Sequence, residues 1–135
     1  MLFMKKNNPI FIVLLFFCFN TNAFSADCSN IDDEQELFNC EKQNLNTYIK
    51  QLNNSVNLIV DKLDSQKEHY VVDRAKYFSE SQKHWENTTE AFCNYVASAE
   101  TGNMKEIKYF LCLVKAMKAR IKNVNTDIKN LKNYK

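Results

Sequence analysis

The chain has 135 residues and a formal net charge of +2 at pH 7, a length that suits one small domain. It contains one glycine and one proline, which argues against a multi-stranded sheet, because such a sheet needs many tight turns. A single glycine also excludes a glycine-rich phosphate loop. No basic patch with interleaved aromatic residues is present, so nucleic-acid binding is not expected.

Residues 1–26 are typical of a secretory signal peptide that is removed. A basic start is followed by the apolar run Ile10–Phe19, about half the roughly 20 residues that a membrane-spanning helix needs. Cleavage could follow any of three small residues, Ala23, Ser25 or Ala26. We expect cleavage at Ala26 or one residue earlier, leaving residues 27–135 as a single domain in the periplasm or outside the cell. A retained N-terminal anchor is the alternative.

Three rows of mostly apolar residues predict long helices at Asp32–Leu63, Gln66–Ser98 and Met104–Asn130. We call each row a seam. Spacings of three and four alternate in each seam and average 3.5, the heptad period, which implies left-handed helix packing. The seam positions are Leu45, Ile49, Leu52, Val56, Ile59 and Leu63; Val71, Ala75, Phe78, Gln82, Trp85, Thr89, Phe92 and Val96; and Ile107, Phe110, Val114, Met117, Ile121, Val124, Ile128 and Leu131.

Short connections between the helices predict an antiparallel, up-down-up three-helix bundle. Two candidate capping boxes, Ser65 with Glu68 and Asn103 with Glu106, mark the starts of the second and third helices. Gly102 marks the second turn clearly. The first turn lacks glycine, so the second helix could also begin several residues later.

Four cysteines remain after the predicted cleavage: Cys28, Cys40, Cys93 and Cys112. An even number of cysteines in a small exported domain suggests two disulfides. Zinc is a weaker alternative, because there is no C-x-x-C pair and no nearby histidine. Folding the helices back on one another gathers all four at one end of the bundle. That arrangement favours Cys28–Cys40 and Cys93–Cys112, although four cysteines allow three pairings.

Charge is distributed unevenly along the chain. Residues 26–100 hold 14 acids and 7 bases, whereas residues 101–135 hold 2 acids and 9 bases. One interpretation is that the helices attract one another across the bundle. The other is that the acidic part presents a face to a cationic partner.

The segment from Ser81 to Cys93 contains the only tryptophan, a histidine and a cysteine, and so invites a catalytic interpretation. Trp85 lies in the second seam, which favours a role as a core aromatic residue, and His84 should point outward. No nucleophile has a base at helical spacing, and nothing indicates a cofactor or a metal site. We therefore expect a protein that is not an enzyme.

Arg120 should lie level with Trp85 if the third helix folds back on the second. It could stack on the indole ring or pair with Glu86 or Glu90. Gln82 is a polar residue at a seam position, where such residues commonly fix the register of helices.

The segment from Gln82 to Cys93 resembles the Q-x-x-W-x-x-x-R-D-x-x-C signature of the LprI-like lysozyme-inhibitor family, which are small exported bacterial domains. The segment from Cys112 to Val124 is similar to the family's C-L-x-x-x-T-x-x-R-I-x-x-L ending. The resemblance spans nearly the whole mature chain. It implies that a set of motif residues builds the fold: Leu52, Asn53, Gln82, Trp85, Arg120 and the four cysteines.

Five positions depart from the family pattern, which has Asp, an aromatic residue, Arg, Asp and Thr there: Ile49, Val56, Thr89, Glu90 and Met117. The resemblance implies an exported, non-enzymatic binding protein that inhibits lysozyme, and the acidic segment suits the cationic surface of common lysozymes. The alternative is a structural or stress-related envelope protein that binds another periplasmic partner or itself. Exposed apolar positions would then form its surface, namely Tyr48, Tyr70, Tyr109 and Leu113.

Overall fold

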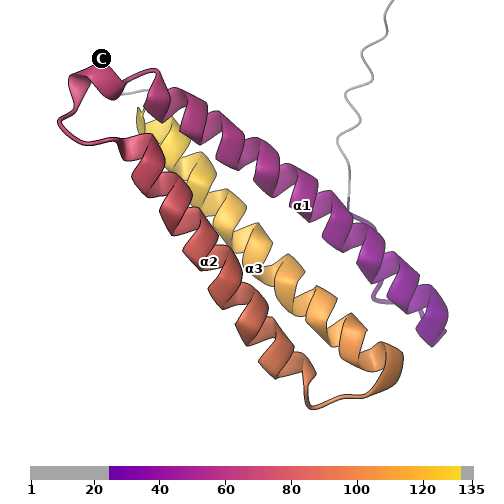
Figure 1. The fold of residues 1–135 in the computed structure, drawn as a ribbon. Coiled ribbons are helices and arrows are strands. Elements are labelled where there is room, and N and C mark those ends of the chain that lie inside the picture. Colours follow the sequence, from indigo (N-terminus) through magenta and orange to yellow (C-terminus); the bar gives the residue numbers. More distant parts are fainter. Residues whose placement is uncertain (1–24, 132–135) are drawn as a thin grey trace, which may run out of the picture.

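The structure is a computed structural model that describes residues 25–131. These residues form three α-helices and no strand, which confirms the all-α prediction. The helices are α1 (Glu34–Asp64), α2 (Arg74–Ala97) and α3 (Gly102–Leu131), with a short 3-10 helix, η1 (Lys67–His69), after α1. The helices lie side by side, and the chain reverses direction after α1 and again after α2 (Figure 1). Most of the predicted signal peptide lies outside the described residues.

Helix α1 begins at an aspartate cap and ends at a serine. The side chain of Asp33 accepts a hydrogen bond from the backbone N–H of Glu36 at 2.8 Å. The carboxylate of Glu36 lies in the first turn, where the helix dipole favours negative charge. Ser65 caps the other end, and its hydroxyl donates to the carbonyl of Lys62 at 2.7 Å. The prediction that Ser65 starts the second helix is therefore wrong.

Helix α2 begins later than Gln66, the start predicted from the sequence. Tyr70 has extended backbone angles, which interrupt any helix that continues from η1. Asp73 supplies the N-cap instead, and its side chain accepts from the backbone N–H of Lys76 at 2.9 Å. Aspartate is among the strongest N-cap residues, so the helix starts directly after it, at Arg74.

Helix α3 begins at the predicted turn. Gly102 has a φ of 59°, a left-handed conformation that glycine adopts without the steric cost other residues incur. Asn103 lies inside α3, and its side-chain amide lies 3.5 Å from the side-chain oxygen of Gln35 on α1. Asn103 therefore contacts another helix and does not precede α3 as the predicted cap.

The apolar core consists of two separate clusters. One cluster joins the end of α1 to the start of α2 and the end of α3, and its buried members are Ile59, Leu63, Ala75, Val124, Ile128 and Leu131. The other lies toward the opposite end, and its buried members are Leu45, Cys93, Leu113 and Val114. Helix α3 contributes to both clusters and has its most extensive contact with α1. The level between the clusters is where the polar residue Gln82 is buried.

The buried face of α2 differs from the predicted seam in its last two turns. Phe92 and Val96 are 57 % and 38 % exposed, whereas Cys93 and Ala97 are buried. An α-helix has 3.6 residues per turn, so a straight helix drifts away from a strict 3.5-residue seam. Other predicted seam positions that are exposed are Ile49 and Val71.

Both favoured cysteine pairs lie at disulfide-bonding distance. The sulfurs of Cys28 and Cys40 are 2.04 Å apart, and those of Cys93 and Cys112 are 2.07 Å apart. The first pair links the segment before α1 to that helix. The second links α2 to α3 close to the turn that joins them. Two disulfides would stabilise a thin bundle whose apolar core is divided into two clusters.

The segment before α1 is held by Asn44, a buried residue of α1. Its Oδ1 accepts from the backbone N–H of Ala26 at 2.8 Å, and its Nδ2 donates to the carbonyl of Ala26 at 3.0 Å. The same Nδ2 lies 3.1 Å from the sulfur of Cys28. Tyr48 donates from its hydroxyl to Ser25 at 3.1 Å. Ser25 and Ala26, which the sequence assigned to the removed segment, therefore make contacts within the fold.

We expect Asn44→Ala to lower the free energy of unfolding by about 1–3 kcal/mol, because it removes the partners of a partly buried backbone amide. Urea unfolding followed by circular dichroism would measure the change. Asn46→Ala is the matched control, since Asn46 is exposed on the same helix. Equal effects of the two substitutions would contradict the role given to Asn44.

Candidate functional site

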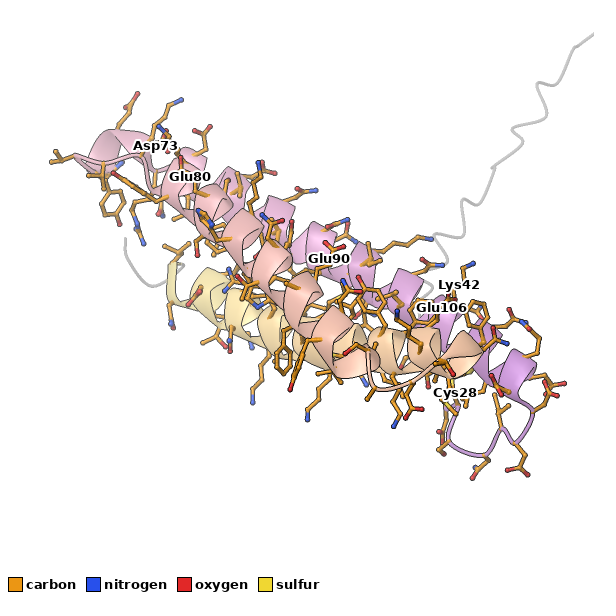
Figure 2. All side chains as sticks on the ribbon, turned by 60° about the horizontal axis from the view of Figure 1, so that its bottom comes forward. Cys28, Lys42, Asp73, Glu80, Glu90 and Glu106 are labelled. Carbon is orange, nitrogen blue, oxygen red and sulfur yellow. A yellow bond between two sulfur atoms is a disulfide. The ribbon has the colours of Figure 1, made fainter. Side chains whose placement is uncertain are left out.

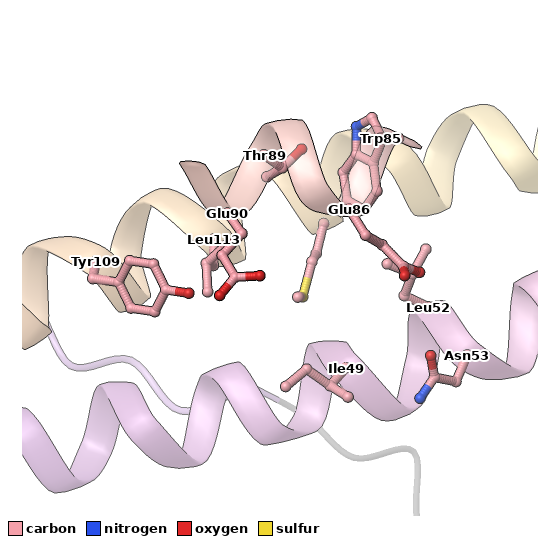
Figure 3. Close-up of a pocket in the computed structure, with 10 residues that line it drawn as sticks. Ile49, Leu52, Asn53, Trp85, Glu86, Thr89, Glu90, Tyr109 and Leu113 are labelled. Atoms are coloured by element: carbon pink, nitrogen blue, oxygen red, sulfur yellow. The ribbon is translucent and has the colours of Figure 1, made fainter. Parts of the chain in front are cut away.

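A groove with a cavity volume of about 250 Å³ opens between α1 and α2, with side chains of α3 beneath it (Figure 3). It borders the core cluster around Leu45 and Cys93, to which its lining residue Leu113 belongs. Ten residues line it: Ile49, Leu52, Asn53, Trp85, Glu86, Thr89, Glu90, Tyr109, Leu113 and Met117.

The groove is open because polar residues face one another across α1 and α2. Helix α2 contributes the exposed Glu86 and Glu90, and α1 contributes the exposed Asn53. Carboxylates keep their hydration more readily than they enter an apolar contact, so the two helices do not close at this level. Ile49, a predicted core residue, is left 36 % exposed beside the opening.

Trp85 is held in place by a polar network at the back of the groove. The guanidinium carbon of Arg120 lies 5.6 Å from the ring centroids of both Trp85 and Phe78. The Nε of Arg120 donates to the Oε1 of Gln82 at 2.9 Å, and the Nε2 of Gln82 donates to Glu86 at 3.0 Å. The contact of Arg120 with the tryptophan was one of two alternatives from the sequence. The other alternative, an ion pair with Glu86 or Glu90, does not occur within residues 25–131.

We expect Arg120→Ala to lower the free energy of unfolding by about 2 kcal/mol, since it removes two ring contacts and leaves an oxygen of Gln82 without its donor. The fluorescence emission of Trp85 should shift to longer wavelength as its ring becomes more exposed to water. Lys122→Ala, an exposed change on the same helix, is the control. If both variants unfold at the same urea concentration, the network does not brace Trp85.

The acidic side chains of the groove lack a cationic partner within the described chain. Glu86 and Glu90 are four residues apart on α2, where like charges repel modestly, and both extend toward the groove in Figure 3. Among residues 25–131, the ion pair with a nitrogen–oxygen distance below 4.0 Å is between Lys67 and Asp64, which are not groove residues. Burial, and then the charge of Glu90, raise the pKa of Tyr109 above the usual value of a phenol.

Charges on the outer faces of the helices point to solvent. Figure 2 shows Glu80 on α2 as one example. The exposed face of α3 carries lysines at seven-residue intervals, namely Lys108, Lys115, Lys122 and Lys129. No ion pair joins α3 to another helix in the described part of the chain, so direct pairing across the bundle does not account for the uneven charge.

The residues that suggested catalysis are not gathered into a site. His84 is exposed and does not line the groove, and the exposed Ser81 does not line it either. Cys93 is buried in a disulfide pair. No group of three or more metal-binding side chains occurs among residues 25–131. Over the same residues, no helix is long and apolar enough to cross a membrane.

The motif residues divide between the groove and its support. Leu52, Asn53 and Trp85 line the groove, whereas Gln82 and Arg120 hold the tryptophan from behind. Sequence reasoning treated all five as structural and missed the groove. Two further lining residues, Tyr109 and Glu86, were interpreted separately, as an exposed surface residue and as a partner of Arg120. Their common location depends on the relative placement of all three helices, which no local spacing reveals.

The apolar surface predicted for another partner is only partly exposed. Leu113 is buried in a core cluster, so its prediction as a surface residue is wrong. Tyr48 and Tyr109 are half-buried, and Tyr70 is exposed. Several apolar side chains outside this predicted surface are more exposed than Tyr70, among them Leu58, Tyr77, Phe92, Tyr95 and Leu111.

A comparison with protein-family models finds a match to the family described as Lysozyme inhibitor LprI, over residues 25–124. Comparisons with curated proteins and with solved structures find no match. The matched range covers most of the chain and includes all four paired cysteines, Arg120 and every residue of the groove.

Proposed function

This chain belongs to the Lysozyme inhibitor LprI family, and on that basis we propose that it is an exported, non-enzymatic protein that binds lysozyme and inhibits it. The observation that carries the proposal is the acidic groove, in which Glu86 and Glu90 flank an aromatic and aliphatic lining without a cation from residues 25–131. Two cysteine pairs at bonding distance support an oxidising compartment such as the periplasm.

Electrostatics favours lysozyme as the partner. Common lysozymes are cationic, and the segment from 26 to 100, which forms two walls of the groove, is acidic. Complementary charge accelerates the encounter of two proteins and fixes their orientation. The groove also contains the half-buried Trp85, and tryptophan is among the residues that contribute most of the binding energy at protein interfaces.

Lysis of bacterial cell walls by lysozyme tests the proposal. Oxidised mature protein in excess should slow the loss of turbidity at low ionic strength. The effect should weaken when the salt is raised to about 0.15 M, where the screening length falls to about 8 Å. Undiminished lysis at low salt, with the protein in excess, would refute the proposed function.

The mature N-terminus is a further part of the proposal. Cleavage after Ala26 would remove the amide that Asn44 binds and the serine that Tyr48 contacts. We therefore place cleavage after Ala23, the earliest of the three candidate positions, which keeps both contacts. The intact mass of exported protein should correspond to a chain that starts at Phe24. A mass that starts at Asp27 would show that neither contact exists in the mature protein.

The finer packing of the bundle also stays a proposal. We infer an up-down-up bundle with left-handed, heptad-like packing of α1 against α3, because both keep their predicted buried rows over most of their length. Helix α2 would follow a straighter course, since its buried face moves to Cys93 and Ala97.

A second candidate function is that of an envelope protein that binds another partner. The observation in its favour is an apolar hollow between α2 and α3, lined in part by the exposed Phe92, Val96 and Leu111 and bordered by Lys108 and Lys115. Recovery of one envelope protein by immobilised chain, with no effect on lysozyme, would favour this function over inhibition.

A further inference from the structure

We propose that the groove between α1 and α2 receives one arginine side chain of a protein partner and binds it next to Trp85. The binding of an arginine side chain follows from the lining of the groove, and only the identity of the partner as lysozyme rests on the proposed function.

The size of the groove suits a single side chain. Pockets for drug-sized ligands have volumes of about 300–1,000 Å³, whereas this groove has about 250 Å³ and is open on one side. A helix or a strand of a partner would not fit between α1 and α2 at this level without moving them apart. A long, thin side chain that enters from solvent would fit.

The lining matches both parts of an arginine side chain. The aliphatic stem would contact apolar residues of the lining, among them Ile49 and Met117. The planar guanidinium is weakly hydrated and stacks on aromatic faces, and Trp85 and Tyr109 supply such rings from α2 and α3. Lysine has a compact, strongly hydrated charge and would gain less from these rings.

The charges around the groove select a cation. Glu86 and Glu90 lie on the α2 side, and no lysine or arginine is among the ten lining residues. Figure 3 shows the hydroxyl of Tyr109 pointing toward the carboxylate of Glu90. Burial is the larger cause of the raised pKa of Tyr109, and the negative charge of Glu90 adds to it. Arg120 contacts Trp85 but does not line the groove, so it does not fill the position of the ligand.

Trp85 provides a direct measurement, because it is the only tryptophan of the chain and it lines the groove. The probe is the peptide acetyl-Gly-Arg-Gly-amide, and its citrulline analogue is the neutral control of nearly equal shape. The arginine peptide should change the Trp85 fluorescence saturably, whereas the citrulline peptide should not. Equal responses to the two peptides, or no saturable response to arginine, would overturn the proposal.

Two variants locate the binding in the groove. Glu86→Gln with Glu90→Gln should weaken binding of the arginine peptide about three- to tenfold, as expected for two exposed charge contacts. The matched control, Glu80→Gln with Glu100→Gln, removes the same charge outside the groove lining and should leave the affinity unchanged. An equal loss in both double variants would show attraction by overall charge and would overturn the proposed site.

Thr89→Arg is a complementary test, because it places an arginine of the chain itself at the edge of the groove. The variant should fold normally by circular dichroism and should no longer respond to the arginine peptide. Unchanged peptide binding in a folded variant would contradict the proposed location.

The outcomes for the site and for the function are separable. Failure of the peptide to bind, with inhibition of lysozyme intact, would reject the arginine site and leave the proposed function standing. Peptide binding without inhibition of lysozyme would support the site and reject lysozyme as the partner.

Discussion

Replacing both Cys93 and Cys112 with alanine is expected to lower the free energy of unfolding by about 3 kcal/mol. The two cysteines are 19 positions apart in the sequence, and closing a loop of about that size reduces the entropy of the unfolded chain by a comparable amount. The link also joins α2 to α3 at the cluster formed around Leu45 and Leu113. For a domain of this size, the midpoint of thermal unfolding should fall by about 10–20 °C.

Thermal and urea unfolding of the double variant would measure this loss. Peptide mapping of the unreduced parent protein should first recover Cys28–Cys40 and Cys93–Cys112 with no free thiol among them. The variant with both Cys28 and Cys40 replaced is the informative comparison, because that pair links only the segment before α1 to the bundle. A thermal midpoint that does not change in the Cys93 and Cys112 variant would contradict the role of this link.

Changing Glu86 and Glu90 together to lysine is expected to abolish inhibition of lysozyme. The substitution replaces two attractive charges by two repulsive ones beside the proposed arginine site, and opposing like charges across an interface cost several kcal/mol. A rise of the dissociation constant by at least about 30-fold follows from a change of about 2 kcal/mol. The fold should persist, because both side chains are exposed and lysine is as good a helix former as glutamate.

The control for this reversal is Glu80→Lys with Glu100→Lys, which changes the net charge by the same amount outside the groove lining. It should modestly slow association with lysozyme, because the overall electrostatic attraction is weaker. The dissociation rate of the complex should change little. If the two double variants lose inhibition equally, overall charge and not the groove determines binding.

Much of the fold was predictable from the sequence because the signals are local. The buried row of α3, from Ile107 to Leu131, follows its predicted seam, and Gly102 marks the turn before it. The start of α2 was less predictable, because Ser65 and Asp73 are both good N-cap residues. Only Asp73 caps the start of α2, whereas Ser65 caps the end of α1. Choosing between them depends on how the chain packs after α1.

The groove was the least predictable feature. The sequence suggested Glu86 only as a possible partner of Arg120, and not as a residue across an opening from α1. The opening arises because Asn53 and Ile49 of α1 face the polar side of α2 and no large apolar residue fills the space. A seam identifies which residues turn inward on one helix. It does not report whether two inward faces meet.

Thr89 connects the sequence with the groove. It stands where the family pattern has Arg, and it is one of the residues that line the groove. A threonine leaves space that a longer side chain at this position would reach, so the substitution fits a groove that accepts an arginine from outside. The departure from the family signature at Thr89 therefore falls within the lining of the groove.

Calorimetric titration of a cationic lysozyme with oxidised mature protein tests the central claim most directly. We predict saturable binding with one protein per lysozyme, weakened by salt and lost when Glu86 and Glu90 are changed to lysine. No heat of binding at low ionic strength, at two temperatures and with excess protein, would contradict the claim that this helical domain acts on lysozyme.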